Sequence, residues 1–495
     1  MSTALYLGVD VGSSATKGVV VDHEGQVVAR ARCDHTVDHP HPGWFEHDAE
    51  QVWWGGLRAV VAHLLNEIRA DRLAAMAVSG MGPCIVAADA ERRPLRAAIL
   101  YGVDGRAAEE IEVLNRTLGS AAVLARSGSP LSSQSIAPKL MWLHRHEPDI
   151  WERTRTVFGV AGYLVHRLTG TYVVDHHTAN QGGPPYVWDA GHWDPDWSDL
   201  IAPDIDLPTL GSPLDVVGQV TAEAATSTGL PAGLPVTAGT YDSWAEAISV
   251  GVEHPGDVVI TYGSTATITA LSDRPLSSPH LWASVGHEPG SYTISGALAT
   301  AGFITDWMRR LVHEDYPELL EEAQKIPPGS RGLLILPYLA GERTPILDPD
   351  ARGVVAGLTI EHERGELYRA ALESIAYALR HNLETMAAAG ADVGRVAAVG
   401  GGTQGVVPLW PQIVSSVIGQ RQYLRRERIG ACYGDAILAA RAVGVDVDVD
   451  EWNPVVDEVA PVQEWRHVYE ERWPLYHRLR LATIDISHAL AHYDH

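Results

Sequence analysis

A carboxylate and a small polar turn lie next to each other near the N-terminus. Apolar residues alternate over positions 5–9, which predicts a strand ending at Asp10, and a second apolar run covers positions 18–21. The glycine and two serines at positions 12–14 form the turn between these runs. Such a turn directs backbone N–H groups and hydroxyls at an anion such as phosphate, and a neighbouring carboxylate can hold Mg²⁺ opposite it. The pattern predicts a phosphate and metal site, although an ordinary polar turn fits equally well.

Lys17 follows this turn and raises the question of a P-loop. That motif requires Gly-x-x-x-x-Gly-Lys-Ser/Thr at the start of a helix. Here alanine and threonine precede the lysine, and the runs at 18–21 and 26–32, separated by a turn at 23–25, predict strands. The segment is therefore a strand–turn–strand meander. Lys17 either reaches phosphate as a point charge or points to solvent.

The turn at positions 12–14 has a counterpart about half the chain later. The sequence GSSAT at 12–16 and the sequence GSTAT at 263–267 nearly match, and β-branched residues flank the second turn. Repetition at this spacing indicates two related domains, each of which offers one hairpin to the same nucleotide. A five-residue match rich in serine and threonine can also arise by chance.

A run of three glycines at positions 400–402 follows the apolar residues 396–399, which predict a strand, and opens a helical region. Close approach of the backbone to adenosine is one interpretation of these glycines. A tight strand-to-helix turn is the other.

The length and composition indicate what kind of protein carries these features. With 495 residues, 46% of them hydrophobic and 20% charged, the chain predicts a well-packed globular protein of two or more domains. No apolar run approaches the roughly eighteen residues of a membrane span, and the N-terminus lacks the basic and hydrophobic stretches of a signal peptide. The three cysteines lie far apart, as in a reducing compartment. We therefore expect a cytoplasmic protein.

The formal net charge of −25 argues against nucleic acid and membrane partners, because it repels phosphate backbones and anionic lipid. Positions 421–428 form the only concentrated basic run, and one such run is usually a solvated face. The expected partner is a small molecule, and homodimer formation is left open.

Six segments, in order along the chain, resemble the FGGY carbohydrate kinases, and most closely the xylulokinases. The resemblance implies an α/β fold with duplicated actin/hexokinase/Hsp70-like (ribonuclease H-like) domains flanking a central cleft. It places an N-terminal domain at 1–248 and a C-terminal domain at 249–495. The six segments are LGVDVGSSATKGVVVD, PGWFEHDAEQVWW, AGTYDSWAEAISVG, ITYGSTATI, positions 337–386, and AAVGGGTQGVVPLWPQIVSSVIG. Within the fifth, positions 353–373 fit the second signature of the family in residue type and spacing.

The resemblance implies transfer of the γ-phosphoryl of MgATP to a hydroxyl of a small sugar or polyol. Asp242 matches the catalytic base of the family, and Asp10 matches an aspartate that organises Mg²⁺, so both are expected to be catalytic. An amide or hydroxyl is common in the family where Gly405 stands, which leaves the adenine contact open. The residues expected to bind the nucleotide are Gly12, Ser13, Ser14, Lys17, Gly263, Ser264, Thr265, Gly302, Gly401, Gly402, Thr403 and Gln404.

Asp242 lies between a predicted strand at 234–238 and a helix expected to begin near Ser243. An aspartate at this place could merely cap the helix. Ser243 and Glu246, however, match a capping box of their own, which would leave Asp242 free to act as a base.

The segments that would contact the sugar depart from the xylulokinase pattern. Met81 and Gly82 are expected to bind substrate, as is Asp242, but Met81-Gly82-Pro83 stands where the family has Met-His-Gly. The histidine is therefore missing, and a lost hydrogen-bonding group changes substrate selectivity strongly.

A second sugar segment, at positions 101–106, keeps Asp104 and Arg106 but loses the neighbouring amide or hydroxyl of the family. Both residues are expected to hydrogen-bond substrate hydroxyls, the arginine through its planar fork. Asp104 could instead cap a helix predicted at 107–118.

These departures leave several substrates open. A ketopentose such as xylulose is the expectation, with ribulose, erythritol or gluconate as alternatives. The fold also serves non-catalytic sugar sensors, which are expected to lose the base or the magnesium aspartate. Because Asp242 and Asp10 are both present, the sequence favours a kinase.

Overall fold

The structure is a computed structural model that describes residues 4–286, 288, 290–403 and 409–493. Its contacts divide the chain into two compact units, each assembled from three stretches of sequence. The first unit comprises Met1–Glu253, Asp273–Thr293 and Ile429–Pro454, and the second comprises His254–Ser272, Ile294–Arg428 and Val455–His495. The first unit therefore includes a segment that lies far away in the sequence, in the C-terminal half.

A mixed sheet with the strand order β13-β14-β5-β1-β2-β3 forms the centre of the first unit, and β15 also pairs with β5. β1 is antiparallel to β2 and parallel to β5. The meander predicted near the N-terminus is thus confirmed. The strand bounds are β1 Leu5–Val11, β2 Ala15–Asp22, β3 Val27–Asp34, β5 Leu73–Gly80, β13 Val216–Gln219, β14 Pro235–Thr237 and β15 Thr240–Tyr241.

The second unit contains a sheet in which β19, β17, β16, β22, β23 and β24 follow one another. β16 is antiparallel to β17 and parallel to β22, which is parallel to β23. The strand bounds are β16 Val258–Tyr262, β17 Ala266–Ser272, β19 Tyr292–Leu298, β22 Val396–Val399, β23 Gln422–Arg425 and β24 Val455–Val459.

The two sheets have the same construction. In each, an antiparallel hairpin (β1–β2 or β16–β17) is extended on one side by a third strand and on the other by two parallel strands and an antiparallel edge strand. Both hairpin turns carry the glycine–hydroxyl sequence, at positions 12–14 and 263–265. The duplicated fold expected from this repeat is confirmed.

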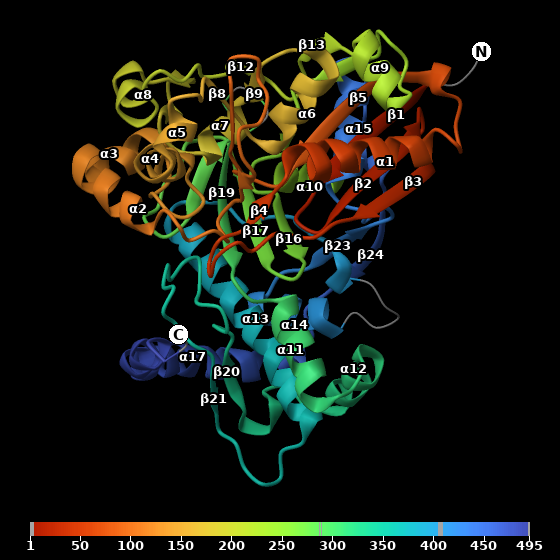
Figure 1. The fold of residues 1–495 in the computed structure, drawn as a ribbon. Helices are drawn as coiled ribbons and strands as arrows, with labels where there is room; N and C mark the ends of the chain where they lie inside the picture. The colour runs from red at the N-terminus through yellow and green to blue at the C-terminus, as the bar shows by residue number, and fades with distance from the viewer. Residues whose placement is uncertain (1–3, 287, 289, 404–408, 494–495) are drawn as a thin grey trace. The chain divides into compact units, whose positions relative to one another are not determined.

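Helix α15 (Ala431–Ala442) packs on β1 and β5 of the first sheet and on α10 (Asp242–Ser249), and Figure 1 shows it in blue beside the red strands. Two glycines permit this close packing. A β-carbon at Gly8 would overlap the carbonyl oxygen of Cys432, and one at Gly434 would overlap that of Ala245. The helix thereby lies directly over the ends of the strands that carry the candidate site.

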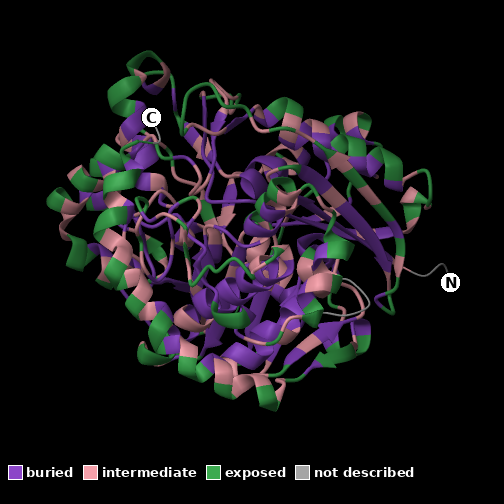
Figure 2. Cartoon of the chain, turned by 90° about the horizontal axis from the view of Figure 1, so that it is seen from below, coloured by how far each residue is buried: buried purple, intermediate pink, exposed green. Residues whose placement is uncertain are grey.

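Buried residues run along most of the central strands, whereas the outer helices carry exposed residues, as Figure 2 shows. None of the helices within the described ranges combines the length and apolar character that a bilayer span requires. Further helices are α1 Gly55–Leu64, α2 Ala108–Leu114, α4 Ile136–His146, α6 Val160–Thr169, α7 His176–Gln181, α8 Pro195–Ile201, α9 Ala222–Thr228, α11 Gly302–Val312, α13 Arg364–Ala388, α14 Leu409–Ile418 and α17 Gln463–Ala491.

Candidate active site

Three strands place Asp10 beside a cation and a hydroxyl. Asp10, near the end of β1, lies opposite Lys17 on β2 and opposite Ser79 on β5. Side chains directly opposite each other on neighbouring strands share one face of the sheet. Lys17 therefore lies on the same face as Asp10. Burial raises the pKa of the Asp10 carboxyl, and the positive charge of Lys17 offsets part of that rise.

The turn at 12–14 connects to a second segment of the first unit. The amide of Gly12 donates to the carbonyl of Ala15 at 3.0 Å, which closes the turn. The hydroxyl of Ser13 lies 2.9 Å from the phenol oxygen of Tyr101, next to the segment expected to bind the sugar. The structure thus brings the expected phosphate turn and the expected sugar segment together.

Asp242 is brought to this place by β15. That strand pairs in parallel with the end of β5, with Tyr241 opposite Gly80, so the next residue continues past the sheet edge. The carboxylate of Asp242 accepts a hydrogen bond of 2.7 Å from the backbone amide of Ser243. Burial and the negative charges of Asp10 and Glu246 raise the pKa of Asp242. A carboxylate with a raised pKa is suited to accept a proton near neutral pH.

The prediction of a capping box at Ser243 was wrong. Helix α10 begins at Asp242 itself, its N-cap is Tyr241, and the cap makes no side-chain hydrogen bond. The strand that ends at Tyr241 fixes the start of the helix one residue earlier than the Ser243–Glu246 pattern indicates. Asp242 therefore occupies the first turn, where the helix dipole favours a negative charge.

Two polar residues of this cluster, Ser79 and Asp435, were not predicted from the sequence. The hydroxyl of Ser79 donates to the carboxylate of Asp435 at 2.7 Å and lies 3.3 Å from that of Asp10. Ser79 follows an apolar run, and its sequence context predicts only an ordinary strand residue. Asp435 stands alone among apolar residues of α15, and that isolated charge is the one signal in the sequence that could have identified it.

The turn that carries Met81 and Gly82 follows β5 directly. The amide of Met81 donates to the carbonyl of Val11 at 2.9 Å, and the Met81 side chain is buried. A β-carbon at Gly82 would lie 3.4 Å from Cδ2 of Tyr241. The ring next to Asp242 therefore packs against the position where the xylulokinase pattern has histidine.

Gln134 covers Gly102 in the second sugar segment. Its Oε1 accepts a hydrogen bond of 2.5 Å from the amide of Gly102, whose carbonyl in turn accepts a hydrogen bond of 2.8 Å from the hydroxyl of Ser133. A β-carbon at Gly102 would lie 2.5 Å from the same Oε1. An amide side chain from a different segment thus stands where the expected amide neighbour is missing.

The side chains of Asp104 and Arg106 are buried against each other. Nε of Arg106 donates to Oδ1 of Asp104 at 2.9 Å and Nη2 donates to Oδ2 at 2.7 Å, while Glu46 accepts from Nη1 at 2.7 Å. Both side chains are 0% exposed. In this arrangement their hydrogen bonds go to protein groups, so direct contact with substrate hydroxyls stays a prediction.

The alternative prediction, that Asp104 caps a helix at 107–118, was wrong. The helix expected at 107–118 is α2, whose N-cap Ala107 makes no side-chain hydrogen bond. The carboxylate of Asp104 instead accepts from the amide of Phe45 at 2.7 Å and from that of Arg106. Because the arginine fork and the Phe45 amide occupy this carboxylate, it does not cap the helix.

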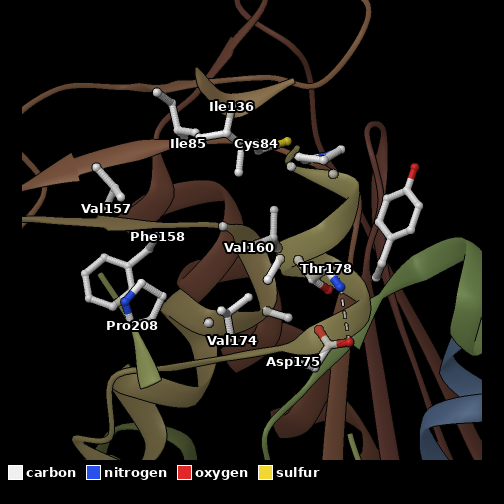
Figure 3. Close-up of a pocket in the computed structure, with 18 of the residues that line it drawn as sticks. Cys84, Ile85, Ile136, Val157, Phe158, Val160, Val174, Asp175, Thr178 and Pro208 are labelled. Carbon is white, nitrogen blue, oxygen red and sulfur yellow. Dashed lines mark hydrogen bonds between the residues drawn. The ribbon is translucent and has the colours of Figure 1, made fainter. Parts of the chain in front are cut away.

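An apolar cavity of about 80 Å³ adjoins the turn at Met81 and Gly82. Figure 3 shows Ile136, Val157 and Phe158 among its lining, with Asp175 hydrogen-bonded to the amide of Thr178 at 3.2 Å. A polyhydroxylated substrate requires many polar partners, and this lining supplies few. The cavity lies beside the expected sugar segments and does not itself fit a sugar.

The second hairpin turn, at 263–265, packs against the start of α11. The amide of Gly302 donates to the carbonyl of Gly263 at 2.9 Å, and the amide of Phe303 donates to that of Ser264 at 2.9 Å. A β-carbon at Gly302 would lie 2.6 Å from the Gly263 oxygen. Gly302 therefore supports the hairpin turn, and the structure brings it together with Gly263, Ser264 and Thr265.

The glycine run follows β22 as expected. Gly400 has φ +97°, in the region that favours glycine, and a β-carbon at Gly402 would lie 2.8 Å from Cζ3 of Trp410. At Gly401 a β-carbon would meet nothing within 4 Å. The hydroxyl of Thr403 donates to the carbonyl of Gly400 at 2.7 Å, which stabilises the turn. Gln404, expected to bind the nucleotide, and Gly405, where the adenine contact was left open, lie outside the described residues.

The residues around Asp10 fit Mg²⁺ held together with phosphate. Burial and, after it, the negative charge of Asp10 raise the pKa values of Asp242 and Asp435, and Lys17 is a cation near Asp10. Within the described ranges no group of three or more histidine, cysteine, aspartate or glutamate side chains could hold a metal ion alone. Mg²⁺ commonly takes one or two carboxylates and completes its shell with water and substrate phosphates. Asp10 suits that arrangement.

Comparison with known families covers most of the chain. Residues 5–249 match the N-terminal domain of the FGGY family of carbohydrate kinases, and residues 258–443 match its C-terminal domain. The second match ends one residue after the end of α15, although α15 packs in the first unit.

Individual relatives and solved structures agree with these family matches. The chain is 32% identical to a xylulose kinase from Escherichia coli over 91% of this chain and 92% of the relative. It is 25% identical to a gluconokinase from Bacillus subtilis over 96% of this chain and 95% of the relative. The crystal structure of xylulose kinase from Rhodospirillum rubrum aligns with a TM-score of 0.89 at 33% identity and covers 98% of this chain and 100% of that one.

Proposed function

Because the chain belongs to the FGGY family of carbohydrate kinases, we propose that it transfers the γ-phosphoryl of MgATP to a hydroxyl of a ketopentose such as xylulose. Sugar kinase activity follows from the family. The observation that supports transfer to a hydroxyl is the buried carboxylate of Asp242, whose pKa is raised by burial and by the charge of Asp10.

Asp242 is proposed as the base that accepts the proton of the attacking hydroxyl. MgATP, when bound, supplies the phosphoryl group and a divalent charge that offsets its negative oxygens. Asp10 would hold the metal ion, and the backbone of residues 12–14 and 263–265 would bind phosphate oxygens. Lys17 lies on the same face as Asp10 and would add a positive charge there.

The nucleotide contacts in the second family domain are proposed from position and backbone geometry. Gly302 supports the turn at 263–265, and Gly401 leaves room for a ligand beside the backbone. Gly402 and Thr403 shape the turn after β22. We also propose the family domain boundary near residue 248, where the matched regions at 5–249 and 258–443 leave a short gap.

Several relatives named xylulose kinase support a ketopentose substrate. The arrangement around Gly82 and Gly102 indicates that recognition differs in detail from the xylulokinase pattern. There, Tyr241 lies beside Gly82, and Oε1 of Gln134 lies where a side chain at Gly102 would begin. A relative named gluconokinase makes gluconate the second candidate.

A substrate panel tests the proposal. ADP release is measured with xylulose, ribulose, erythritol, gluconate and glycerol, and xylulose is expected to give the highest kcat/KM. Preference for another member of the panel would replace the substrate, and no sugar-stimulated turnover with any member would favour a sugar sensor.

Replacement of the base tests the mechanism. Asp242→Ala is expected to reduce kcat by at least about 10²-fold, because general base catalysis contributes roughly 10² to 10⁴ in rate. ATP binding, measured by calorimetry, should stay within a few-fold of the unaltered protein. Asp189→Ala, an exposed aspartate of the same unit, is the matched control. Near-normal turnover by Asp242→Ala would exclude it as the base.

A further inference from the structure

Asp435 is a fully buried carboxylate that the proposed reaction does not use. It lies on α15, is 0% exposed, and approaches the end of β5. The hydroxyl of Ser79, which is also 0% exposed, lies 2.7 Å from Oδ2 of Asp435 and 3.3 Å from Oδ1 of Asp10. Ser79 is therefore the bridge between Asp435 and the residue expected to hold Mg²⁺.

The hydroxyl of Ser79 is held in place by its hydrogen bond to Asp435. A serine hydroxyl carries one proton and so donates one hydrogen bond at a time, whereas it accepts from other donors. Ser79 donates to Oδ2 of Asp435 at 2.7 Å, and its oxygen lies 3.3 Å from Oδ1 of Asp10. The hydrogen bond to Asp435 therefore fixes the position of the hydroxyl that stands beside the carboxylate of Asp10.

Asp435 is costly as a purely structural residue. Its Oδ1 is buried and has no hydrogen-bond partner. A buried polar atom without a partner lowers the stability of the fold, and apolar residues of similar size often replace buried polar groups without loss of stability. The neighbouring residues of this helix are apolar, with Ile437 and Leu438 fully buried. A contribution to the site explains the carboxylate better than packing does.

We propose that Asp435 is a positioning residue that, through Ser79, fixes the carboxylate of Asp10 in the orientation that binds Mg²⁺. The inference rests on the proposed function, because Asp10 is the expected magnesium residue of the kinase. Partners that orient a metal ligand through hydrogen bonds commonly contribute 10- to 100-fold to metal affinity.

Calorimetry of ADP binding at a series of Mg²⁺ concentrations tests the proposal without any sugar. Asp435→Ala and Ser79→Ala are each expected to raise the Mg²⁺ concentration needed for half-maximal enhancement of ADP affinity by about tenfold. Asp435→Asn keeps an oxygen that can accept the hydrogen bond of Ser79 but carries no charge, and it should stay within about threefold of the unaltered protein. Its rescue would show that the hydrogen bond matters and the charge does not.

A double variant and a packing control separate positioning from stability. Ser79→Ala combined with Asp435→Ala should be no worse than either single change, because both interrupt one chain. Leu438→Ala, on the same buried helix, should lower the melting temperature without changing the Mg²⁺ dependence. Unchanged Mg²⁺ dependence in Asp435→Ala, additive losses in the double variant, or an equal shift in Leu438→Ala would each overturn the proposal.

The outcome is separable from that of the proposed function. If no sugar in the panel is phosphorylated but Mg²⁺-dependent ADP binding shifts as expected, the positioning role stands and the kinase proposal fails. If the panel gives turnover but the shift is absent, the kinase stands and Asp435 has no positioning role.

Discussion

The protonation state of Asp242 should make the rate of phosphoryl transfer depend on the charges around this carboxylate. Its carboxylate must be ionised to accept a proton, and the negative charge of Glu246 raises its pKa. Glu246→Gln removes that charge and stabilises the ionised form, so the pKa of Asp242 falls. We expect the acidic limb of the pH profile of kcat/KM to move to lower pH in this variant.

Glu223→Gln, an exposed change on α9, is the control for this pH profile. It removes a negative charge from the same unit without approaching Asp242, and its acidic limb should match that of the unaltered protein. An unmoved limb in Glu246→Gln would mean that another group controls the rate.

The same carboxylate should reduce the stability of the fold at neutral and alkaline pH. A folded pKa raised above the unfolded value means that stability is fully present below the unfolded pKa and is lost as pH rises through the folded one. Asp242→Asn carries no charge at any pH. Its melting temperature should therefore exceed that of the unaltered protein above about pH 8, whereas the difference should shrink toward about pH 4.

Thermal unfolding across this pH range checks the prediction, with Asp189→Asn as an exposed control that should show little change. A difference between Asp242→Asn and the unaltered protein that stays constant with pH would contradict it. Asp242→Asn is therefore expected to be more stable than the unaltered protein but to lack turnover. Such an exchange of activity for stability is common where an active site holds an unfavourable charge.

At the scale of elements, the close contact between α15 and α10 determines where Asp435 lies. A β-carbon at Gly434 would overlap the carbonyl oxygen of Ala245, which belongs to the backbone and cannot rotate away. Gly434→Ala should therefore destabilise the protein by about 1–3 kcal/mol through overpacking. Intrinsic helix propensity alone predicts the opposite sign, by about 1 kcal/mol.

Chemical denaturation of Gly434→Ala and Gly55→Ala distinguishes these two effects. Gly55 begins α1 with φ −61°, and a β-carbon there would lie 3.4 Å from its nearest neighbour. The control should be neutral or slightly stabilised. A Gly434→Ala variant that is as stable as the control would show that the two helices can separate at no cost.

Local elements were the most predictable part of the fold. The alternation at 5–9 predicts β1, and the residues at 396–399 predict β22, because the periodicity of a strand is contained within the strand. The start of α10 was predicted one residue late, since the pairing of β15 with β5 fixes it and no local signal records that pairing.

The site was only partly predictable for the same reason. Asp10 and Asp242 lie in recognisable segments, whereas Ser79 and Asp435 are 356 positions apart and meet only through the packing of α15 on β5. The pairing of Asp104 with Arg106 was also not predicted. Each side chain was expected to hydrogen-bond substrate hydroxyls, and in the structure they hydrogen-bond each other. Long-range contacts of this kind depend on topology, which a local pattern does not contain.

At the scale of the whole molecule, the first unit depends on a distant segment of the chain. α15 covers strands β1 and β5, and a chain ending at Glu253 would expose their apolar side chains to water. Apolar burial is the main favourable term in folding, at roughly 25 cal/mol per Å². We therefore expect residues 1–253 alone to lack a cooperative thermal transition and to aggregate.

Restoring the missing helix should restore the fold of this unit. A chain of residues 1–293 joined through a flexible glycine–serine linker to residues 429–454 contains every stretch of the first unit. It should unfold cooperatively and show native-like near-ultraviolet circular dichroism, whereas the same chain with Asp435→Ala should differ from it only modestly in melting temperature. A cooperative transition in residues 1–253 alone would show that α15 is not required for folding. Its role would then be confined to carrying Asp435 to the site.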